Sequence, residues 1–364
     1  MIVQDVINQL EELAPLAYAE DFDNVGLLVG DKNNKITGVL ITLDTLETVV
    51  DEAIAKNCNL IVSFHPIIFK GLKKLTGKSY VERVVMKAIK NDIAIYSMHT
   101  ALDNALQGVN DMICNQLELI NKRILIPQSH SIKKLTTYVP KDEAEQLRNA
   151  LFRAGGGSLG NYDACSFNAN GIGTFKANEN AKPTKGKKGQ VHFEEETKIT
   201  ITYAKHAESN ILKALFKTHS YEEVAYEITS IENKNQNIGM GMVAELTEPM
   251  QPEAFLKYLK AKMNTKLIRH SALINKPIKR IAVLGGSGSF AIQAAKQAEA
   301  DVFITSDLKY HDFFTAENRI ILADIGHYES EQYTKNLLVA YLTKKISNFA
   351  IVLSKTNTNP VKYF

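Results

Sequence analysis

One short segment near the C-terminal end carries two metal-binding residue types at a helical spacing. In residues 324–331, His327 and Glu331 lie four positions apart, after an apolar run typical of a strand and before an amphipathic pattern. If a helix begins near His327, both side chains share one face and can converge on one point. An imidazole and a carboxylate so placed suit a divalent ion such as Zn, Mn or Fe. The alternative is a solvated helix start with a compatible i,i+4 pair.

Other polar residues also follow apolar, strand-like runs. Asp103 lies four positions after one of these residues, His99. In open α/β sheets ligands bind beyond the carboxyl ends of the strands, so we expect these residues to gather at one edge of one sheet. Taken singly, each is more typical of a structural residue. Together they supply ligands from separate segments, as a catalytic metal site requires. The residues are Asp44, His65, His99, Gly285 to Ser289, Asp307 and His327.

A glycine-rich loop forms a second candidate site. Gly285, Gly286, Ser287 and Gly288 follow a strand-like run and precede an Ala-rich helical pattern. The backbone N–H groups of such a loop, together with the helix dipole, could bind an anion. The loop lacks the Lys of a P-loop and the full spacing of a dinucleotide fingerprint. The alternative is a tight strand-to-helix turn.

The order of strand and helix patterns predicts two domains. Strands and helices alternate through residues 1–126 and again through residues 239–364, which indicates a mainly parallel sheet covered on both faces. Between them, residues 127–238 show two β-α-β passes, typical of a ferredoxin-like α+β fold. Within this part, residues 168–171 are rich in Asn and Gly and predict a link between two short strands. We therefore expect an α/β domain interrupted by an inserted α+β domain.

Composition excludes several classes of protein. The chain has 364 residues and a net charge of +3, with dispersed Lys residues that give no argument for nucleic acid. Cys58, Cys114 and Cys165 lie far apart, which argues against a Cys-based zinc site and a disulfide framework and favours a reducing compartment. We see no signal-peptide pattern and no apolar run of membrane-spanning length, so a cytoplasmic protein is expected.

Four segments, in order, resemble the signature segments of the GTP cyclohydrolase 1 type 2 homolog family, also called the NGG-interacting-factor-three-like family. The resemblance covers essentially the whole chain and includes the inserted part, which looks like the PII or CutA fold of longer bacterial members through residues 175–178 and 219–224. The four segments are residues 63–69, 99–104, 305–311 and 326–331.

The resemblance implies a toroidal homohexamer with a two-metal site inside the ring. Carried over residue by residue, the ligands are His65, Asp103, His327 and Glu331. Phe64 stands where the family usually has the first His of a pair, and a phenyl ring cannot bind a metal. The second ion could then bind weakly, be completed by His99 or water, or be absent. We therefore expect one or two divalent ions per chain.

Two classes of function follow. The first is a metal-dependent hydrolase of a nucleotide-like or phosphorylated small molecule, in which His99 or His311 moves protons and the Gly285–Ser289 loop binds a phosphate. The second is a non-catalytic metal-binding scaffold or regulator, whose inserted domain senses a small ligand or partner. Nucleic-acid binding comes last, because it needs a basic face that the sequence does not show.

Overall fold

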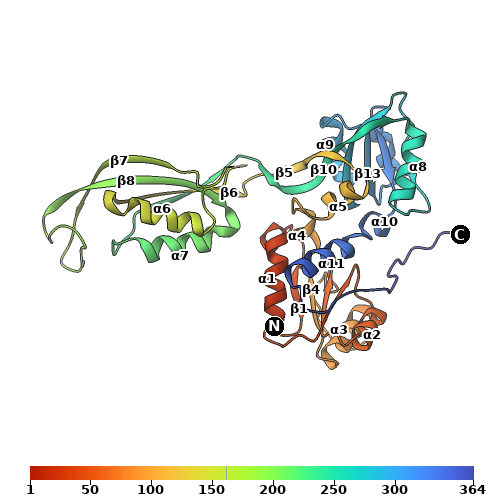
Figure 1. Cartoon of the computed structure of the whole chain (residues 1–364), viewed down its shortest axis with the longest axis horizontal. Coiled ribbons are helices and arrows are strands. Elements are labelled where there is room, and N and C mark those ends of the chain that lie inside the picture. The colour runs from red at the N-terminus through yellow and green to blue at the C-terminus, as the bar shows by residue number, and fades with distance from the viewer. Residues whose placement is uncertain (161) are drawn as a thin grey trace. The chain divides into compact units, whose positions relative to one another are not determined.

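The computed structural model describes residues 1–160 and 162–364, and it divides into two compact units. The first unit consists of residues 1–126 and 237–364, and the second of residues 127–236. Figure 1 shows the elements of both units along the chain. Among the described residues, none of the helices combines the length and apolar character needed to cross a bilayer.

The first sheet of the first unit has five strands in the order β1-β4-β3-β2-β15. Neighbouring strands from β4 to β15 run parallel, and β1 is antiparallel to β4. One buried cluster joins this sheet to α2 and α3, and another joins it to α1 and α11. The strands are β1 (Gly26–Val29), β2 (Val39–Thr42), β3 (Leu60–Ser63), β4 (Ala94–Ser97) and β15 (Ile351–Leu353). The helices are α1 (Val3–Leu13), α2 (Glu47–Ala55), α3 (Tyr80–Lys90), α4 (His99–Asp103), α5 (Val109–Gln116) and α11 (Thr334–Lys345).

The second sheet of this unit has six strands in the order β11-β14-β13-β12-β10-β5. β12, β13 and β14 run parallel, whereas β10 and β11 pair with their neighbours β12 and β14 in antiparallel fashion. The strands are β5 (Ile120–Gln128), β10 (Asn235–Met250), β11 (Arg269–His270), β12 (Ile278–Ser287), β13 (Val302–Ser306) and β14 (Ile321–Asp324). The helices are α8 (Pro252–Lys262), α9 (Ile292–Gln297) and α10 (His327–Glu331).

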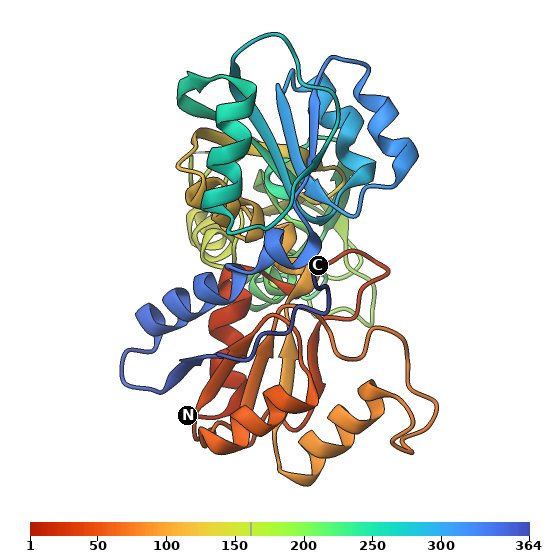
Figure 2. The same cartoon turned by 90° about the vertical axis from the view of Figure 1, so that its right-hand side faces the viewer.

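The prediction of a mixed α/β fold is confirmed, but the expectation of a single sheet is wrong. Most strands of each half of this unit form a separate sheet, but β5 from the first half joins the second sheet and β15 returns to the first sheet. Figure 2 shows both sheets, with α10 and the C-terminal end between them. Periodicity along the sequence identifies such passes but does not say which strands join into one sheet.

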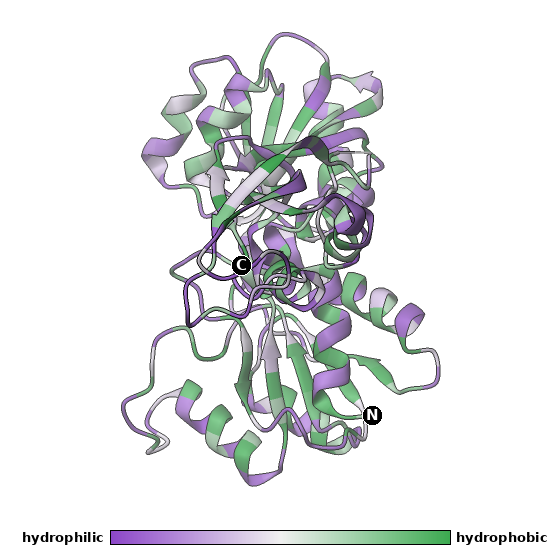
Figure 3. Cartoon of the chain, turned by 90° about the vertical axis from the view of Figure 1, so that its left-hand side faces the viewer, coloured by the Kyte–Doolittle hydropathy of each residue, from purple (hydrophilic) through white to green (hydrophobic). Residues whose placement is uncertain are grey.

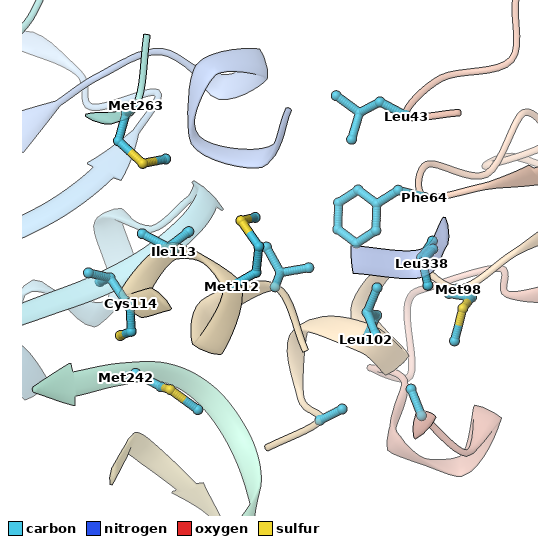
Figure 4. Close-up of a cluster of buried hydrophobic side chains, with 14 of the residues drawn as sticks. Leu43, Phe64, Met98, Leu102, Met112, Ile113, Cys114, Met242, Met263 and Leu338 are labelled. Atoms are coloured by element: carbon cyan, nitrogen blue, oxygen red, sulfur yellow. The ribbon is translucent and has the colours of Figure 1, made fainter. Parts of the chain in front are cut away.

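Apolar residues concentrate on the strands, whereas the helices alternate between apolar and polar residues and many loops are polar (Figure 3). The largest buried cluster includes side chains from both sheets and from α5 and α11. Phe64 is fully buried in it, in the same region as Leu43, Met98, Leu102 and Leu338 (Figure 4). Burying this much apolar surface fixes the strand ends that carry the polar residues described below.

The second unit has the element order β-α-β-β-α-β and one four-stranded sheet in the order β7-β8-β6-β9. β8 is antiparallel to β7 and β6, and β6 is antiparallel to β9. One buried cluster includes side chains of this sheet and of both helices. The elements are β6 (Ile132–Pro140), α6 (Ala144–Arg153), β7 (Phe167–Lys176), β8 (Val191–Ala204), α7 (Glu208–Thr218) and β9 (Tyr226–Ile231).

Candidate metal centre

Three ligand-type side chains of the first unit converge on one point. Oε2 of Glu331 lies 3.1 Å from Nε2 of His65 and 3.2 Å from Nε2 of His327. The two Nε2 atoms are 3.4 Å apart. We call His65, His327 and Glu331 the metal cluster, because their ligand atoms all lie within 4.8 Å of one another.

The two sheets supply the cluster through the loops and helices at their strand ends. His65 follows β3 of the first sheet, whereas α10 begins at His327 and ends at Glu331, just after β14 of the second sheet. The predicted helix start at His327 and the i,i+4 contact with Glu331 are both confirmed. Gly326 adopts φ 91°, which turns the chain from the strand into α10 at little cost for a glycine.

A second carboxylate orients each imidazole. Nδ1 of His65 lies 2.8 Å from Oδ1 of Asp44, and Nδ1 of His327 lies 2.7 Å from Oδ2 of Asp307. Both aspartates follow strands, β2 and β13, and both were noted in the sequence without this role. Such carboxylate partners hold the ring in place and leave Nε2 to face an ion, as is common for metal-binding histidines.

The charges of the cluster shift its pKa values strongly. Burial alone would lower the pKa of His65, but Glu331 and then Asp44 outweigh it and raise the pKa to about 10. Burial alone would also lower the pKa of His327, but Glu331 and then Asp307 outweigh it and raise this pKa to about 9. Burial would raise the pKa of Glu331, yet His65 and His327 lower it to about 2. The cluster therefore attracts positive charge, either as protons or as a metal ion.

Asp103, the fourth ligand predicted from the family resemblance, ends α4 and is not part of the three-residue cluster. Its Oδ1 is buried and accepts no hydrogen bond from any described residue. Burial first, and then Glu331, raises its pKa well above the usual range. A buried carboxyl oxygen without a donor is costly, and a nearby cation would stabilise its ionised form.

The residues present fit a divalent ion. Two imidazoles and a carboxylate are the donor set that zinc and related ions use in proteins. Oε2 of Glu331 lies 3.1 Å and 3.2 Å from the two Nε2 atoms, so all three ligand atoms face the same point. The cluster could therefore hold a metal ion.

His99 lies beside the cluster but is held by a different carboxylate. Its ring centroid is 5.4 Å from that of His65, and its Nδ1 is 2.8 Å from Oδ1 of Asp23. The other oxygen of Asp23 accepts hydrogen bonds from the backbone N–H and the hydroxyl of Thr100. Burial opposes ionisation of Asp23, but His99 and Thr100 lower its pKa to about 2. His99 also has φ 23°, a strained value for a residue with a side chain, and such strain is typical of functional sites.

Two other predicted groups lie apart from these contacts. His311 is exposed on a short 3-10 helix, where its ring contacts those of Tyr310 and Phe314. In the glycine-rich loop, the N–H of Gly285 already donates to Asn110, and that of Gly286 donates to Ser330. A proton-transfer role of His311 and an anion site at residues 285–288 stay predictions.

The glycine-rich loop instead makes room for the cluster. A Cβ at Gly286, which has φ 68°, would lie 2.5 Å from Oε1 of Glu331. Any larger residue would therefore push the Glu331 carboxylate away or distort the loop. The predicted loop is in large part the end of a strand, because residues 285–287 are the last residues of β12.

Phe64 occupies the position where the family resemblance implied another ligand. Its ring is fully buried, and its centroid lies 4.9 Å from that of His65 and 5.6 Å from that of His99. The phenyl ring thus forms an apolar border between the core and the polar site. The ring packs in the core at this position, and it has no lone pair to donate to an ion.

A cavity of about 460 Å³ opens beside the metal cluster and is lined in part by His65 and His327. We call it the cluster cavity. Part of its wall comes from the C-terminal segment, residues 354–364, which the sequence did not single out. Thr358 donates a hydrogen bond to Asp44, the carboxylate that orients His65. The turn-forming residues at 357–360 were the only local signal for this segment.

Comparison with known proteins agrees with the sequence resemblance. The family model Duf34/NIF3 (NGG1p interacting factor 3) matches residues 1–360. A GTP cyclohydrolase 1 type 2 homolog from Bacillus subtilis is 38% identical over 99% of this chain and 98% of that protein. A GTP cyclohydrolase 1 type 2 homolog from Halalkalibacterium halodurans is 36% identical over 99% of this chain and 98% of that protein. The crystal structure of a Bacillus cereus protein related to NIF3 has a TM-score of 0.86 and 34% identity, covering 100% of this chain and 99% of that one. The chain therefore belongs to the Duf34/NIF3 family.

Proposed function

We propose that this protein is a divalent-metal-dependent hydrolase of small molecules, with the ion held by His65, His327 and Glu331. One observation carries the proposal: three ligand-type side chains from two sheets converge within 4.8 Å at the edge of a cavity. The names of its relatives, GTP cyclohydrolase 1 type 2 homologs, agree with hydrolysis as the reaction class. A donor set of two imidazoles and a carboxylate suits Zn, Mn or Fe.

When bound, the ion would polarise the substrate and activate a water molecule for attack. The chain's own residues prepare the site for this. Asp44 and Asp307 hold the two imidazoles with Nε2 towards Glu331. The buried carboxyl of Asp103 is available as a further ligand, since its Oδ1 has no other donor in the described chain.

His99 is the proposed proton carrier. Its Nδ1 is engaged by Asp23, so the other ring nitrogen is the one left to accept or release a proton. The same hydrogen bond, together with the contacts of Asp23 to Thr100, fixes the ring next to His65. Asp23 therefore acts as the orienting partner of the proposed carrier.

The second unit is, in this proposal, a ferredoxin-like domain inserted into the metal-binding domain. Its β-α-β-β-α-β order and its strand order β7-β8-β6-β9 support that assignment. Its likeness to PII and CutA proteins, a ligand-sensing role and a homohexameric ring stay predictions from the family resemblance.

One observation favours a second candidate, a metal-binding scaffold without turnover. Phe64 is fully buried in the hydrophobic core, so the position that the resemblance assigned to a second metal's ligand serves packing. A centre reduced to one ion could still tie the two sheets together through His65 and α10. Loss of this ion would then change the stability or assembly of the protein, and there would be no catalytic activity for it to affect.

The test combines metal loading with a substrate screen. Native protein and a Glu331→Gln variant are loaded with Zn, Mn or Fe(II) and incubated with nucleosides and phosphorylated small molecules, and the products are identified by mass spectrometry. The proposal expects turnover by native protein that chelation abolishes, that added metal restores and that Glu331→Gln lacks. Turnover that survives in Glu331→Gln would contradict it. A metal-loaded protein without turnover, but with a higher melting temperature, would favour the scaffold.

A further inference from the structure

The cluster cavity has a negatively charged wall. Four carboxylates line it, those of Asp44, Asp307, Asp324 and Glu329, whereas Arg269 is the only Lys or Arg among the described residues that line it. Arg269 already forms an ion pair with Asp324, at 2.6 Å, and its guanidinium packs over a phenylalanine ring. His65 and His327 also line the cavity, but each imidazole is paired with Glu331 and with Asp44 or Asp307. In the metal-free protein, no described cationic side chain of the wall is therefore left unpaired for an anionic ligand.

Glu329 is the wall carboxylate that lacks a charged partner. It is only 6% exposed. Its Oε1 accepts hydrogen bonds from the amide of Asn359, at 3.1 Å, and the hydroxyl of Tyr363, at 3.4 Å. Its Oε2 accepts none within the described residues, and no described cation lies within ion-pair distance. A buried carboxylate so placed gains from a ligand that brings a positive charge or an N–H donor.

The phenols of the wall respond to the same negative field. Burial, followed by the charges of Asp44 and Glu329, raises the pKa of Tyr328. Burial and then the charge and hydrogen bond of Glu329 raise the pKa of Tyr363. Both phenols therefore stay protonated and can act as donors.

The rest of the wall is aliphatic and sets the shape of a ligand. Leu267 and Leu308 come from the second-sheet side, and Pro360 and Val361 come from the C-terminal segment. A volume of about 460 Å³ lies in the range of small-molecule sites. The cavity thus offers an apolar surface for a compact ring and carboxylates for its polar edge.

We propose that the cluster cavity binds a compact, uncharged or cationic small molecule that presents N–H donors to Glu329, and that it excludes polyphosphates. This narrows the expected substrate class from phosphorylated molecules to nitrogen-rich ones without phosphate. As a substrate class it rests on the proposed hydrolase function. As a binding property it stands on the cavity alone.

Three probes of one shape and different charge test the proposal: benzamidinium, benzamide and benzoate. Each is titrated into the full-length protein and followed by calorimetry or ligand-observed NMR. We expect benzamidinium to bind tightest and benzoate weakest, with about a tenfold difference or more, the size of a charge-assisted hydrogen bond. Benzoate binding as tightly as benzamidinium, or no binding of benzamidinium, would overturn the proposal.

Two variants locate the binding. Glu329→Gln keeps an acceptor for Asn359 and Tyr363 but removes the charge, and it should weaken benzamidinium about tenfold. Val361→Lys places a cation on a wall residue that is 54% exposed, so the fold should tolerate it, and it should weaken benzamidinium and strengthen benzoate. The matched control Glu299→Gln removes a carboxylate that is 84% exposed and does not line the cluster cavity, and it should change the binding of neither probe. Unchanged benzamidinium binding in both wall variants would refute the assignment.

The same titrations in Glu331→Gln separate this proposal from the proposed function. Glu331 is a cluster ligand and does not line the cavity. Charge selectivity that persists in this variant supports the cavity proposal whether or not metal binding and turnover are found. Selectivity that is lost with metal loading unchanged would overturn the cavity proposal alone.

Discussion

Two of the cavities formed by the described residues differ in their chemistry, the cluster cavity and one in the second unit. The cavity of the second unit is the larger, about 640 Å³, and is lined by β7 and the nearby loops. Its polar groups are satisfied locally: the hydroxyl of Tyr221 donates to Glu196, and Lys185 pairs with Glu194. The cluster cavity, at about 460 Å³, adjoins buried groups from two sheets whose pKa values are strongly shifted. Convergence of buried titratable groups, rather than cavity size, marks the chemical site.

The largest expected effect separates the two regions directly. Glu331→Gln removes the carboxylate shared by both imidazoles, so the affinity for Zn²⁺ should fall more than about 100-fold, beyond the loss expected for an outer partner. Glu196→Gln makes the same change in the second-unit cavity and should leave the affinity unaltered. Competition with a chelating dye measures both. Equal affinities of native protein and Glu331→Gln would mean that the ion binds elsewhere.

A smaller effect is expected from the orienting carboxylates. Asp44→Asn and Asp307→Asn leave the ligands in place but loosen one imidazole each, which should cost roughly 10- to 100-fold in metal affinity. Asp44 is 31% exposed and Asp307 49% exposed, so solvent should mask the loss more in Asp307→Asn. The same competition assay ranks the two. A larger loss of metal affinity in Asp307→Asn than in Asp44→Asn would contradict this ranking.

The pH dependence of metal binding gives a third contrast. The raised pKa values of His65, about 10, and His327, about 9, mean that protons occupy the metal-free imidazoles at neutral pH. Metal binding must displace them, so Zn²⁺ affinity should rise between pH 6 and 8, by roughly tenfold per pH unit for each proton released. Calorimetry in buffers of different ionisation enthalpy counts those protons. A flat profile would contradict the shared-charge picture of the cluster.

The smallest effect is expected where the chain borders the site with packing alone. Phe64→Leu keeps the core apolar and should cost about 1–2 kcal/mol of unfolding free energy, with no change in metal affinity. Urea denaturation and the competition assay measure the two quantities. A loss of metal affinity larger than that of Asp44→Asn would show that the ring positions the cluster instead of only filling the core.

Local patterns predicted much of the architecture. Apolar runs located the parallel strands, and the spacing of His327 and Glu331 predicted a shared helical face that α10 provides. The expected link at residues 168–171 is wrong: β7 runs unbroken from Phe167 to Lys176. This is an edge strand, and pairing with β8 holds its Asn and Gly residues extended despite their turn preference.

Long-range relations could not be predicted in this way. Asp23 and His99 are 76 positions apart, and Thr358 and Asp44 are 314 apart, so no local pattern connects them. The sequence also contained no signal that the first unit would form two sheets instead of the single sheet expected. Such pairings follow from tertiary packing, which brings side chains together only after the strands have been arranged.

Anomalous diffraction from crystals grown with zinc, recorded on both sides of the zinc absorption edge, tests the central claim most directly. The account predicts one strong peak in the first unit, about 2.0–2.2 Å from Nε2 of His65, Nε2 of His327 and an oxygen of Glu331. The same data from Glu331→Gln crystals should show that peak lost or greatly weakened. A native map with no peak at these three residues, or with its main peak elsewhere on the chain, would contradict it.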